Sequence, residues 1–445
     1  MPKPSLPRHL LLITLALSLL AAACGPAPTP LPLPTRTPRP GVATPTGTFQ
    51  VPSSKLTPTP SPTWNVKPET PSATPVPGKP TATPVPAKPT LTPGSGSQQG
   101  RMQSPEYGIQ VFLWWQPETT DRDLQLARDA GFTWIKQNFS WIDIEGAKKG
   151  ALDWNEADRI VEKAQEYGLD IVARVDKEPE WARKGASKGP VANYNDYGDF
   201  LFQMATRYRG RIRAYEVWNE PNKSEEWGGK QADAVEYVKM LKVAYQRIKQ
   251  ADPKAIVVSA GLAPTTAGAP HVPDDLFLKR MYVAGAKPYF DVLGAHGTGF
   301  KAPPETDPAD IASGKLKQYC AWEKLEDCAR VWCFRHVEDL RKIMVDNGDS
   351  AKQIMILEFG WDSDQRKIGQ YEWHYVSEET KAEYIIRAFQ YAQKNWAPWI
   401  GAMTLIYIAD PRWTKDNEQY WWSITDPDGT PRPAYTRFKQ WRQGQ

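Results

Sequence analysis

The chain has 445 residues and a formal net charge of +4, from 55 Lys and Arg against 51 Asp and Glu. So small an excess does not favour nucleic acid or an anionic membrane surface as a partner, because both attract clustered positive charge. Many of the 42 prolines lie before residue 103, so the composition of the whole chain describes the remainder poorly.

The first residues have the pattern of an export signal. Lys3 and Arg8 precede an apolar run at 10–20, and small residues follow up to Cys24. The run is shorter than the ~20 residues of a transmembrane helix. Residues 1–24 resemble a bacterial lipoprotein signal, which implies that Cys24 carries the lipid. We therefore expect an exported cell-surface or outer-membrane lipoprotein. The alternative is an ordinary secretory signal cut near Ala23, which would leave the protein fully secreted.

Residues 25–103 are rich in proline and threonine and have almost no apolar periodicity. Such a stretch cannot bury enough surface to offset the entropy of ordering it. We expect a disordered linker, extended in the manner of polyproline, that works as a semi-rigid stalk.

From residue 104 to residue 445 the sequence alternates between strand and helix patterns. Alternation of this kind predicts a parallel sheet, and eight units predict a closed (β/α)8 TIM barrel that forms one catalytic domain. A doubly wound open sheet is the alternative, but the sequence lacks its glycine fingerprint. The predicted strands are 108–113, 133–139, 169–175, 212–218, 255–260, 291–296, 354–358 and 402–408, and the helices are 120–130, 156–166, 194–208, 232–250, 274–284, 334–347, 378–393 and 434–442.

Two predicted strands deliver a glutamate at the carboxyl-terminal end. Glu220 follows the fourth strand, just before Pro221, and Glu358 ends the seventh. In a barrel both face the same mouth, where they can approach to the ~5 Å that a retaining double displacement uses. Either glutamate alone could be a barrel residue in a salt bridge, but together at strand ends they indicate catalysis.

The stretches Trp218-Asn219-Glu220-Pro221-Asn222 and Glu358-Phe359-Gly360-Trp361 resemble the signatures of clan A glycoside hydrolases, of the family 39 kind and also of family 5. The resemblance implies that Glu220 is the general acid/base and Glu358 the nucleophile. It also implies that Asn219 hydrogen-bonds the sugar 2-hydroxyl, that His296 lies near the nucleophile, and that Tyr407 is a sugar platform.

The same assignment follows from acid–base chemistry. Glu220 must be protonated near neutral pH to donate to the leaving oxygen, so we expect an apolar rim and the second carboxylate to raise its pKa. Glu358 must stay ionised, and Arg174 and Asn219 are candidate donors to it. Lys136 and Gln137 either reach the mouth or are polar groups inside the barrel.

Aromatic residues follow nearly every predicted strand, and a ring of them at the mouth is typical of a carbohydrate cleft. Trp141, Trp227 and Trp361 are the strongest candidates for stacking on sugar rings. The alternative for any one of them is packing of the loops.

No metal or cofactor is expected. The five histidines lack metal-ligand spacing. Cys320, Cys328 and Cys333 lie in one predicted insertion after the sixth strand, and two of them should pair in an exported protein. Sequence leaves the pairing open, although Cys320 with Cys333 would close the whole insertion.

These features predict a monomeric retaining glycosidase (EC 3.2.1 class) acting on a β-linked polysaccharide or oligosaccharide, held to a membrane only by its lipid. The aromatic cluster favours a groove and endo action, but glycan, linkage and mode stay open. A carbohydrate-binding lipoprotein and a transglycosylase on the same barrel are the alternatives.

Overall fold

The computed structural model describes residues 101–183, 189, 191–366 and 372–445. The predicted signal peptide with Cys24 and the predicted linker up to residue 100 lie outside these described residues. Among the described residues, no helix combines the length and apolar character that a bilayer crossing would need.

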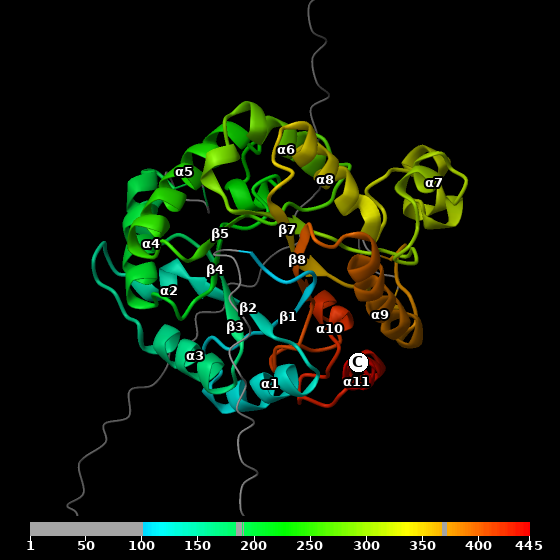
Figure 1. Cartoon of the computed structure of the whole chain (residues 1–445), viewed down its shortest axis with the longest axis horizontal. Coiled ribbons are helices and arrows are strands. Elements are labelled where there is room, and N and C mark those ends of the chain that lie inside the picture. Colours follow the sequence, from blue (N-terminus) through cyan, green and yellow to red (C-terminus); the bar gives the residue numbers. More distant parts are fainter. Residues whose placement is uncertain (1–100, 184–188, 190, 367–371) are drawn as a thin grey trace, which may run out of the picture. The chain divides into compact units, whose positions relative to one another are not determined.

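Eight parallel strands close into a barrel in which each pairs with the next along the chain and β8 returns to β1 (Figure 1). This confirms the predicted (β/α)8 fold. The strands are β1 (Glu106–Gln110), β2 (Trp134–Ser140), β3 (Asp170–Asp176), β4 (Ala214–Val217), β5 (Ile256–Ser259), β6 (Val292–His296), β7 (Gln353–Phe359) and β8 (Ile400–Leu405).

One long helix follows each strand and covers the outside of the barrel, close to where the apolar periodicity predicted it. These helices are α1 (Pro117–Asp129), α3 (Asn155–Glu166), α4 (Tyr194–Arg207), α5 (Ala234–Ala251), α6 (Asp274–Val283), α8 (Val337–Asp346), α9 (Glu378–Asn395) and α11 (Pro433–Gln443). Three short helices in the connections were not predicted, namely α2 (Trp141–Glu145), α7 (Pro308–Ala312) and α10 (Glu418–Trp422). Each is a single short turn of helix, too brief for a periodic pattern.

Alternation along the strands separates two cores. Inward side chains fill the barrel, and outward ones pack against the helices. Met102 closes the barrel at its amino-terminal end, because its backbone exchanges hydrogen bonds of 2.9 and 3.0 Å with the side chain of Gln353. The packed barrel thus includes a residue just before the predicted start at 104. The interior core consists of Met102, Trp134, Val172, Ala214, Ile256, Val258, Val292, Met355, Leu357 and Ala402.

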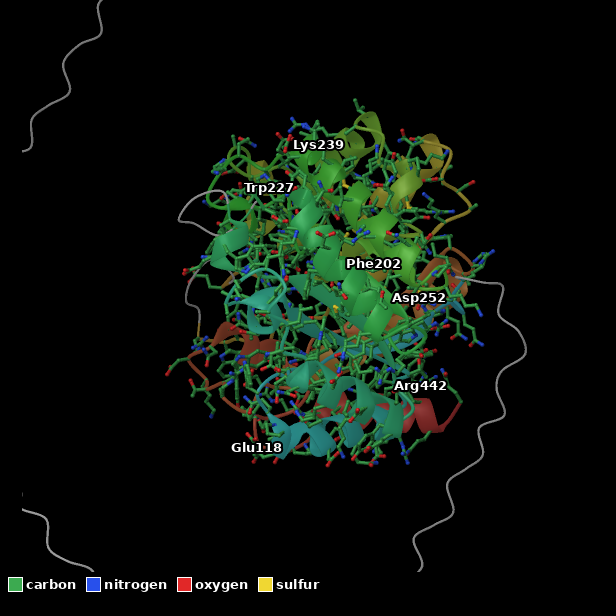
Figure 2. All side chains as sticks on the ribbon, turned by 90° about the vertical axis from the view of Figure 1, so that its left-hand side faces the viewer. Glu118, Phe202, Trp227, Lys239, Asp252 and Arg442 are labelled. Carbon is green, nitrogen blue, oxygen red and sulfur yellow. A yellow bond between two sulfur atoms is a disulfide. The ribbon has the colours of Figure 1, made fainter. Side chains whose placement is uncertain are left out.

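The carboxyl ends of all strands meet at one face, which we call the mouth. Figure 2 shows the barrel from the side, with Glu118 and Trp227, which follow strands, towards the left and Asp252 and Arg442, at helix ends, towards the right. The mouth therefore faces left in Figure 2, and the strand–helix connections that carry function lie there.

The longest connection at the mouth, residues 297–333, follows β6 and contains α7, which projects beyond the ring of barrel helices (Figure 1). Its disulfide joins Cys320 to Cys328, whose Cα atoms are 4.5 Å apart. The expected pairing of Cys320 with Cys333 is therefore wrong. Cys333 is a free, buried thiol that packs with Cys320 in a small apolar cluster, and burial raises its pKa to about 12. The bridge therefore closes only a short loop within the insertion, and Cys333 is left out of it.

Candidate active site

Glu220 lies in a strained turn immediately after β4. Trp218 and Glu220 have φ values of 74° and 40°, in the left-handed region that non-glycine residues rarely adopt. The backbone amide of Glu220 donates to the carbonyl of Gly261 at 3.1 Å, which ties the turn to the end of β5. Strain of this kind persists where the surroundings impose it, and it is common at functional sites.

Glu358 faces the mouth because β7 contains a bulge. Ala295 of β6 pairs with Ile356, but His296 pairs with Glu358, so Leu357 is an extra residue in the ladder. Simple alternation would place Glu358 on the outer face, since Leu357 already points into the barrel core. The bulge turns both side chains inward and sets Glu358 opposite His296.

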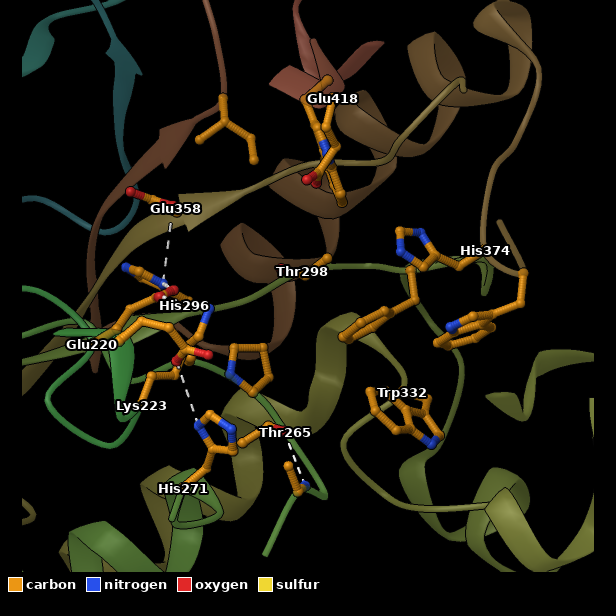
Figure 3. Close-up of a pocket in the computed structure, with 18 of the residues that line it drawn as sticks. Glu220, Lys223, Thr265, His271, His296, Thr298, Trp332, Glu358, His374 and Glu418 are labelled. Carbon is orange, nitrogen blue, oxygen red and sulfur yellow. Dashed lines mark hydrogen bonds and ion pairs between the residues drawn. The ribbon is translucent and has the colours of Figure 1, made fainter. Parts of the chain in front are cut away.

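The two carboxylates meet around a histidine, as Figure 3 shows. His296 Nδ1 lies 3.0 Å from Glu220 Oε1 and 4.0 Å from Glu358 Oε2. One oxygen of each carboxylate and a ring nitrogen of His296 all lie within 4.8 Å of one another. Gly261 makes room for the ring, because a Cβ there would lie 2.2 Å from His296 Nε2.

Positive charge surrounds Glu358 from inside the barrel. Lys136 Nζ lies 2.7 Å from Glu358 Oε1, and an Arg174 guanidinium nitrogen lies 3.7 Å from the same oxygen. Burial alone would raise the pKa of Glu358, but the charges of Lys136, His296 and Arg174 outweigh it and lower the pKa to about 2. Glu358 is therefore ionised at neutral pH, as a nucleophile must be.

Sequence left Lys136 and Gln137 undecided, and the structure places Lys136 against the Glu358 carboxylate. It is fully buried and also lies 3.4 Å from Glu216, a buried carboxylate on β4. Gln137, in contrast, binds backbone, since its Oε1 accepts from the amide of Leu113 at 2.8 Å. Strand alternation explains the difference, because neighbouring residues face opposite sides.

The raised pKa expected for Glu220 is not what the free protein has. Burial raises the pKa of Glu220, but the hydrogen bond with His296 and the charges of His296 and Lys223 lower it to below its usual value. The expectation counted the apolar rim and Glu358 and missed these neighbours. A bound ligand would have to change the surroundings of Glu220 before it could act as an acid.

A pocket of about 350 Å³ opens above the two carboxylates (Figure 3). Its aromatic wall comes from both ends of the β6 insertion, Phe300 and Trp332, and from Trp373, in the connection after β7. The rings of Phe300 and Trp373 are stacked, 5.7 Å apart and at 12°. The opposite wall comes from the connections after β4 and β5 and is formed by Lys223, Glu225, Ala263, Pro264, Thr265, Ala267 and His271.

Three of the expected sugar platforms are core residues instead. Trp141 stacks on Phe200 and donates to Glu145 at 2.7 Å, and Trp361 donates to the carbonyl of Ala302 at 3.0 Å. Trp141, Trp361 and Trp227 are all buried, and none lines the pocket. Tyr407 does line it. Position after a strand does not separate the two groups, because Trp227 lies farther from β4 than Phe300 does from β6 and is buried, whereas Tyr407 comes just after β8 and lines the pocket.

Asn219 and Arg174 both lie next to the two carboxylates. Asn219 is buried beside Glu220, and its Oδ1 has no hydrogen-bond partner among the described residues. Arg174 donates to Asp176 at 2.8 Å, which holds the guanidinium close to Glu358. A free acceptor beside the acid is available to a ligand hydroxyl.

Glu220, His296 and Glu358 are also the one group among the described residues whose spacing could hold a metal ion. Lys136 argues against that use, because its ammonium group already neutralises Glu358 at 2.7 Å. The donor set is better suited to acid–base chemistry.

Comparisons with known proteins agree with this geometry. Residues 94–284, fewer than half of the chain, match the cellulase family (glycosyl hydrolase family 5). A family 39 glycoside hydrolase from the gut symbiont Bacteroides cellulosilyticus WH2 has a TM-score of 0.55 at 18% identity, covering 77% of this chain and 64% of that one. The chain thus spans less than two thirds of that relative. No curated protein sequence matches it.

Two further solved structures have the same barrel. A glucosidase from Croceicoccus marinus has a TM-score of 0.55 at 14% identity, covering 78% of this chain and 69% of that one. A family 39 enzyme from Xanthomonas axonopodis pv. citri has a TM-score of 0.51 at 14% identity, covering 79% and 72%. A family model of glycoside hydrolases thus matches part of the chain, and the solved structures show that the chain shares the barrel of such enzymes.

Proposed function

We propose that the protein is a retaining glycosidase that cleaves a β-linked polysaccharide or oligosaccharide through a covalent glycosyl-enzyme intermediate. Glu358 is the nucleophile and Glu220 the general acid/base. The observation that carries the proposal is the approach of one oxygen from each carboxylate to within 4.8 Å. Retaining enzymes hold their carboxyl groups ~5–5.5 Å apart, whereas inverting enzymes leave ~6.5–9.5 Å for a water molecule.

In the first step a Glu358 oxygen attacks the anomeric carbon, and the bond from that carbon to the leaving oxygen breaks. Lys136 and Arg174 both face Oε1, so Oε2 is the freer oxygen to form the new bond. Glu220 gives its proton to the leaving oxygen and becomes a carboxylate. In the second step it takes a proton from water, the water oxygen bonds to the anomeric carbon, and Glu358 is released.

His296 supports the proton transfers. Its Nδ1 is 3.0 Å from Glu220 Oε1, and a ring nitrogen can either donate or accept. A sugar in the pocket excludes water from Glu220 and strengthens the effect of burial, which raises its pKa. His296 can supply the proton that Glu220 then passes to the leaving group, and it regains a proton from Glu220 once Glu220 has taken one from water in the second step.

Asn219 and the aromatic wall bind the substrate. The free Oδ1 of Asn219 accepts a hydrogen bond from a sugar hydroxyl next to the reacting carbon. Phe300, Trp332 and Trp373 present flat rings on which the apolar face of a pyranose stacks. The β-linkage is supported by the family match, whose name, cellulase, denotes hydrolysis of a β-linked glucan.

We also propose that the enzyme works as a monomer at the cell surface or outer membrane, tethered through Cys24 and its proline-rich stalk. The support for the anchor and the stalk is the signal-like pattern up to Cys24 and the Pro/Thr-rich composition of residues 25–103.

Trapping the intermediate tests the mechanism. Aryl 2-deoxy-2-fluoro-β-glycosides of glucose, xylose and mannose are incubated with the full chain, and the peptides are examined by mass spectrometry. We expect one of them to add a single glycosyl group to Glu358, and Glu358→Gln to add none. Turnover without a trapped adduct, with an inverted first product by NMR, would contradict the retaining assignment. A polymer that is bound tightly but never cleaved would favour the carbohydrate-binding alternative.

A further inference from the structure

The rim of the mouth carries an exposed tryptophan that does not line the catalytic pocket. Trp115 follows β1, and 57% of its side chain is exposed. Glu118, three residues later at the start of α1, marks this part of the rim in Figure 2. Single exposed apolar side chains are common, so exposure alone implies nothing. The way the chain holds this residue is more informative.

The backbone of Trp115 is held in a strained conformation. Its φ of 59° lies in the left-handed region, which a bulky side chain disfavours. Its amide donates to Glu156 Oε2 at 3.0 Å, and Arg159 holds Glu156 at 2.7 Å while donating to the carbonyl of Leu113 at 2.6 Å. The backbone at Trp115 is therefore held by a network of charged hydrogen bonds, while the indole lies edge-on to Trp114 at 6.2 Å and leaves more than half of its side chain in solvent.

Strain of this kind is concentrated at the mouth. Every non-glycine residue with positive φ among the described residues lies in a segment that follows a strand, and two of them, Glu220 and Phe300, line the pocket. The shared pattern places Trp115 at the face of the barrel that carries the pocket, and the rings beside it indicate its use. The full set is Trp115, Lys177, Trp218, Glu220, Phe300, Trp322 and Glu323.

Aromatic rings lead from the pocket towards β1. Tyr407 lines the pocket, and its ring lies 5.4 Å from Phe112 and 5.3 Å from Trp413. Phe112 and Trp413 are in turn 4.7 Å apart. All three rings belong to the segments that follow β1 and β8. An apolar surface therefore continues out of the pocket on this side.

The segment that carries Trp413 is joined to the one that carries Trp115. With its amide oxygen turned towards Arg412, Gln116 accepts a hydrogen bond from Arg412 Nε at 3.0 Å. Arg412 and Gln116 are the direct neighbours of Trp413 and Trp115 in the sequence. Trp115 therefore stands on the rim next to the aromatic surface that begins at Tyr407.

We infer that Trp115 is a stacking platform for a sugar residue of a long glycan that leaves the pocket across the β8–β1 side of the rim. The pocket of about 350 Å³ is near the lower end of the ~300–1,000 Å³ typical of ligand sites. A longer chain must extend beyond it, and a neutral pyranose offers the flat apolar face that an indole binds. The inference rests on the proposed function in taking a glycan as the ligand, and it makes the substrate a polymer.

The test compares Trp115→Gly, which removes both ring and strain, with Trp115→Phe, which keeps a flat ring. Trp322→Gly is the matched control, because Trp322 is 43% exposed with a φ of 54° but lies on the β6 insertion. Each variant is made in a Glu358→Gln background and run by affinity electrophoresis in gels that contain carboxymethylcellulose, xylan or glucomannan. For the polymer that retards the parent we expect Trp115→Gly to weaken binding about tenfold, a loss of ~1.4 kcal/mol. Trp115→Phe should stay within about threefold, and Trp322→Gly should bind as the parent does.

Activity and stability complete the test. With a functional Glu358, Trp115→Gly should keep the parental kcat/KM on an aryl glycoside, and its Tm should not fall because glycine adopts this φ freely. Unchanged polymer binding in Trp115→Gly, equal weakening in Trp322→Gly, or no retardation of the parent in any gel would overturn the inference. Binding through Trp115 without cleavage would remove the proposed function and leave the platform. Polymer cleavage and binding that do not change in Trp115→Gly would remove the platform and leave the proposed function.

Discussion

Replacing Lys136 by methionine should bring the ionisation of the nucleophile into the measurable pH range. In the native protein the pKa of Glu358 falls from 4.5 to about 2, a stabilisation of the carboxylate by roughly 3 kcal/mol at 1.36 kcal/mol per unit. Lys136 is the nearest cation, at 2.7 Å. At an effective dielectric constant of ~20, unit charges ~4 Å apart interact by about 4 kcal/mol, so its loss can cancel the whole depression.

The expected pKa of Glu358 in Lys136→Met is therefore about 4.5 or above, because burial is then opposed only by His296 and Arg174. The direction of the pH effect follows from the form of Glu358 that reacts. The carboxylate attacks, so kcat/KM falls as the pH drops through this pKa. The acid limb of the pH profile should move upward by about two pH units or more.

The assay is kcat/KM for an aryl glycoside between pH 3 and 8, with folding checked by circular dichroism at each pH. Lys381→Met is the matched control, because Lys381 is also fully buried. Its ammonium group donates to two backbone carbonyls, each at 2.7 Å, and makes no contact with Glu358. It should lower stability without moving the limb. An acid limb in folded Lys136→Met that stays below pH 3 would refute the electrostatic account of Glu358.

Three further outcomes are expected. Glu220→Ala should slow hydrolysis of glycosides with poor leaving groups by ~10²–10⁴-fold and of activated aryl glycosides far less, whereas equal slowing of both would remove its acid role. Trp141→Ala should lower the free energy of unfolding by ~3–5 kcal/mol in urea titrations, while Trp373→Ala should raise KM with little effect on stability. A raised KM in Trp141→Ala with unchanged stability would place the sugar platform at Trp141. Peptide mapping without reduction should find Cys333 alkylated only after unfolding, and a disulfide that contains Cys333 in the native protein would contradict this. Cys328→Ser should lower the free energy of unfolding by about 2–3 kcal/mol, because the short loop closed by the disulfide is lost.

Much of the fold could be read from the sequence because it rests on local patterns. Alternating apolar runs and helical periodicity set the strands and barrel helices to within a few residues, and these repeat regularly enough to predict closure. The meeting of two carboxylates at the mouth was equally accessible, since Glu220 and Glu358 stand at strand ends and every parallel strand ends at the same face. Short helices such as α2 and α7 carried no periodic signal.

The tertiary structure alone decided how those groups act. The bulge at Leu357 turns Glu358 inward, and no local sequence pattern predicts this one extra residue in the pairing of β6 with β7. His296 sets the electrostatics of Glu220 from a strand 76 positions away, so the pKa expected from an apolar rim had the wrong direction.

The same division explains the aromatic residues. Sequence indicated that tryptophans gather after the strands, but packing assigned Trp141, Trp227 and Trp361 to the core and left Phe300, Trp332 and Trp373 at the pocket. A tryptophan is identified as core or platform by what lies against it, and those contacts come from distant segments. The sequence by itself therefore determined the class of fold and the identity of the two carboxylates, while their charge states and the binding surface follow from long-range contacts.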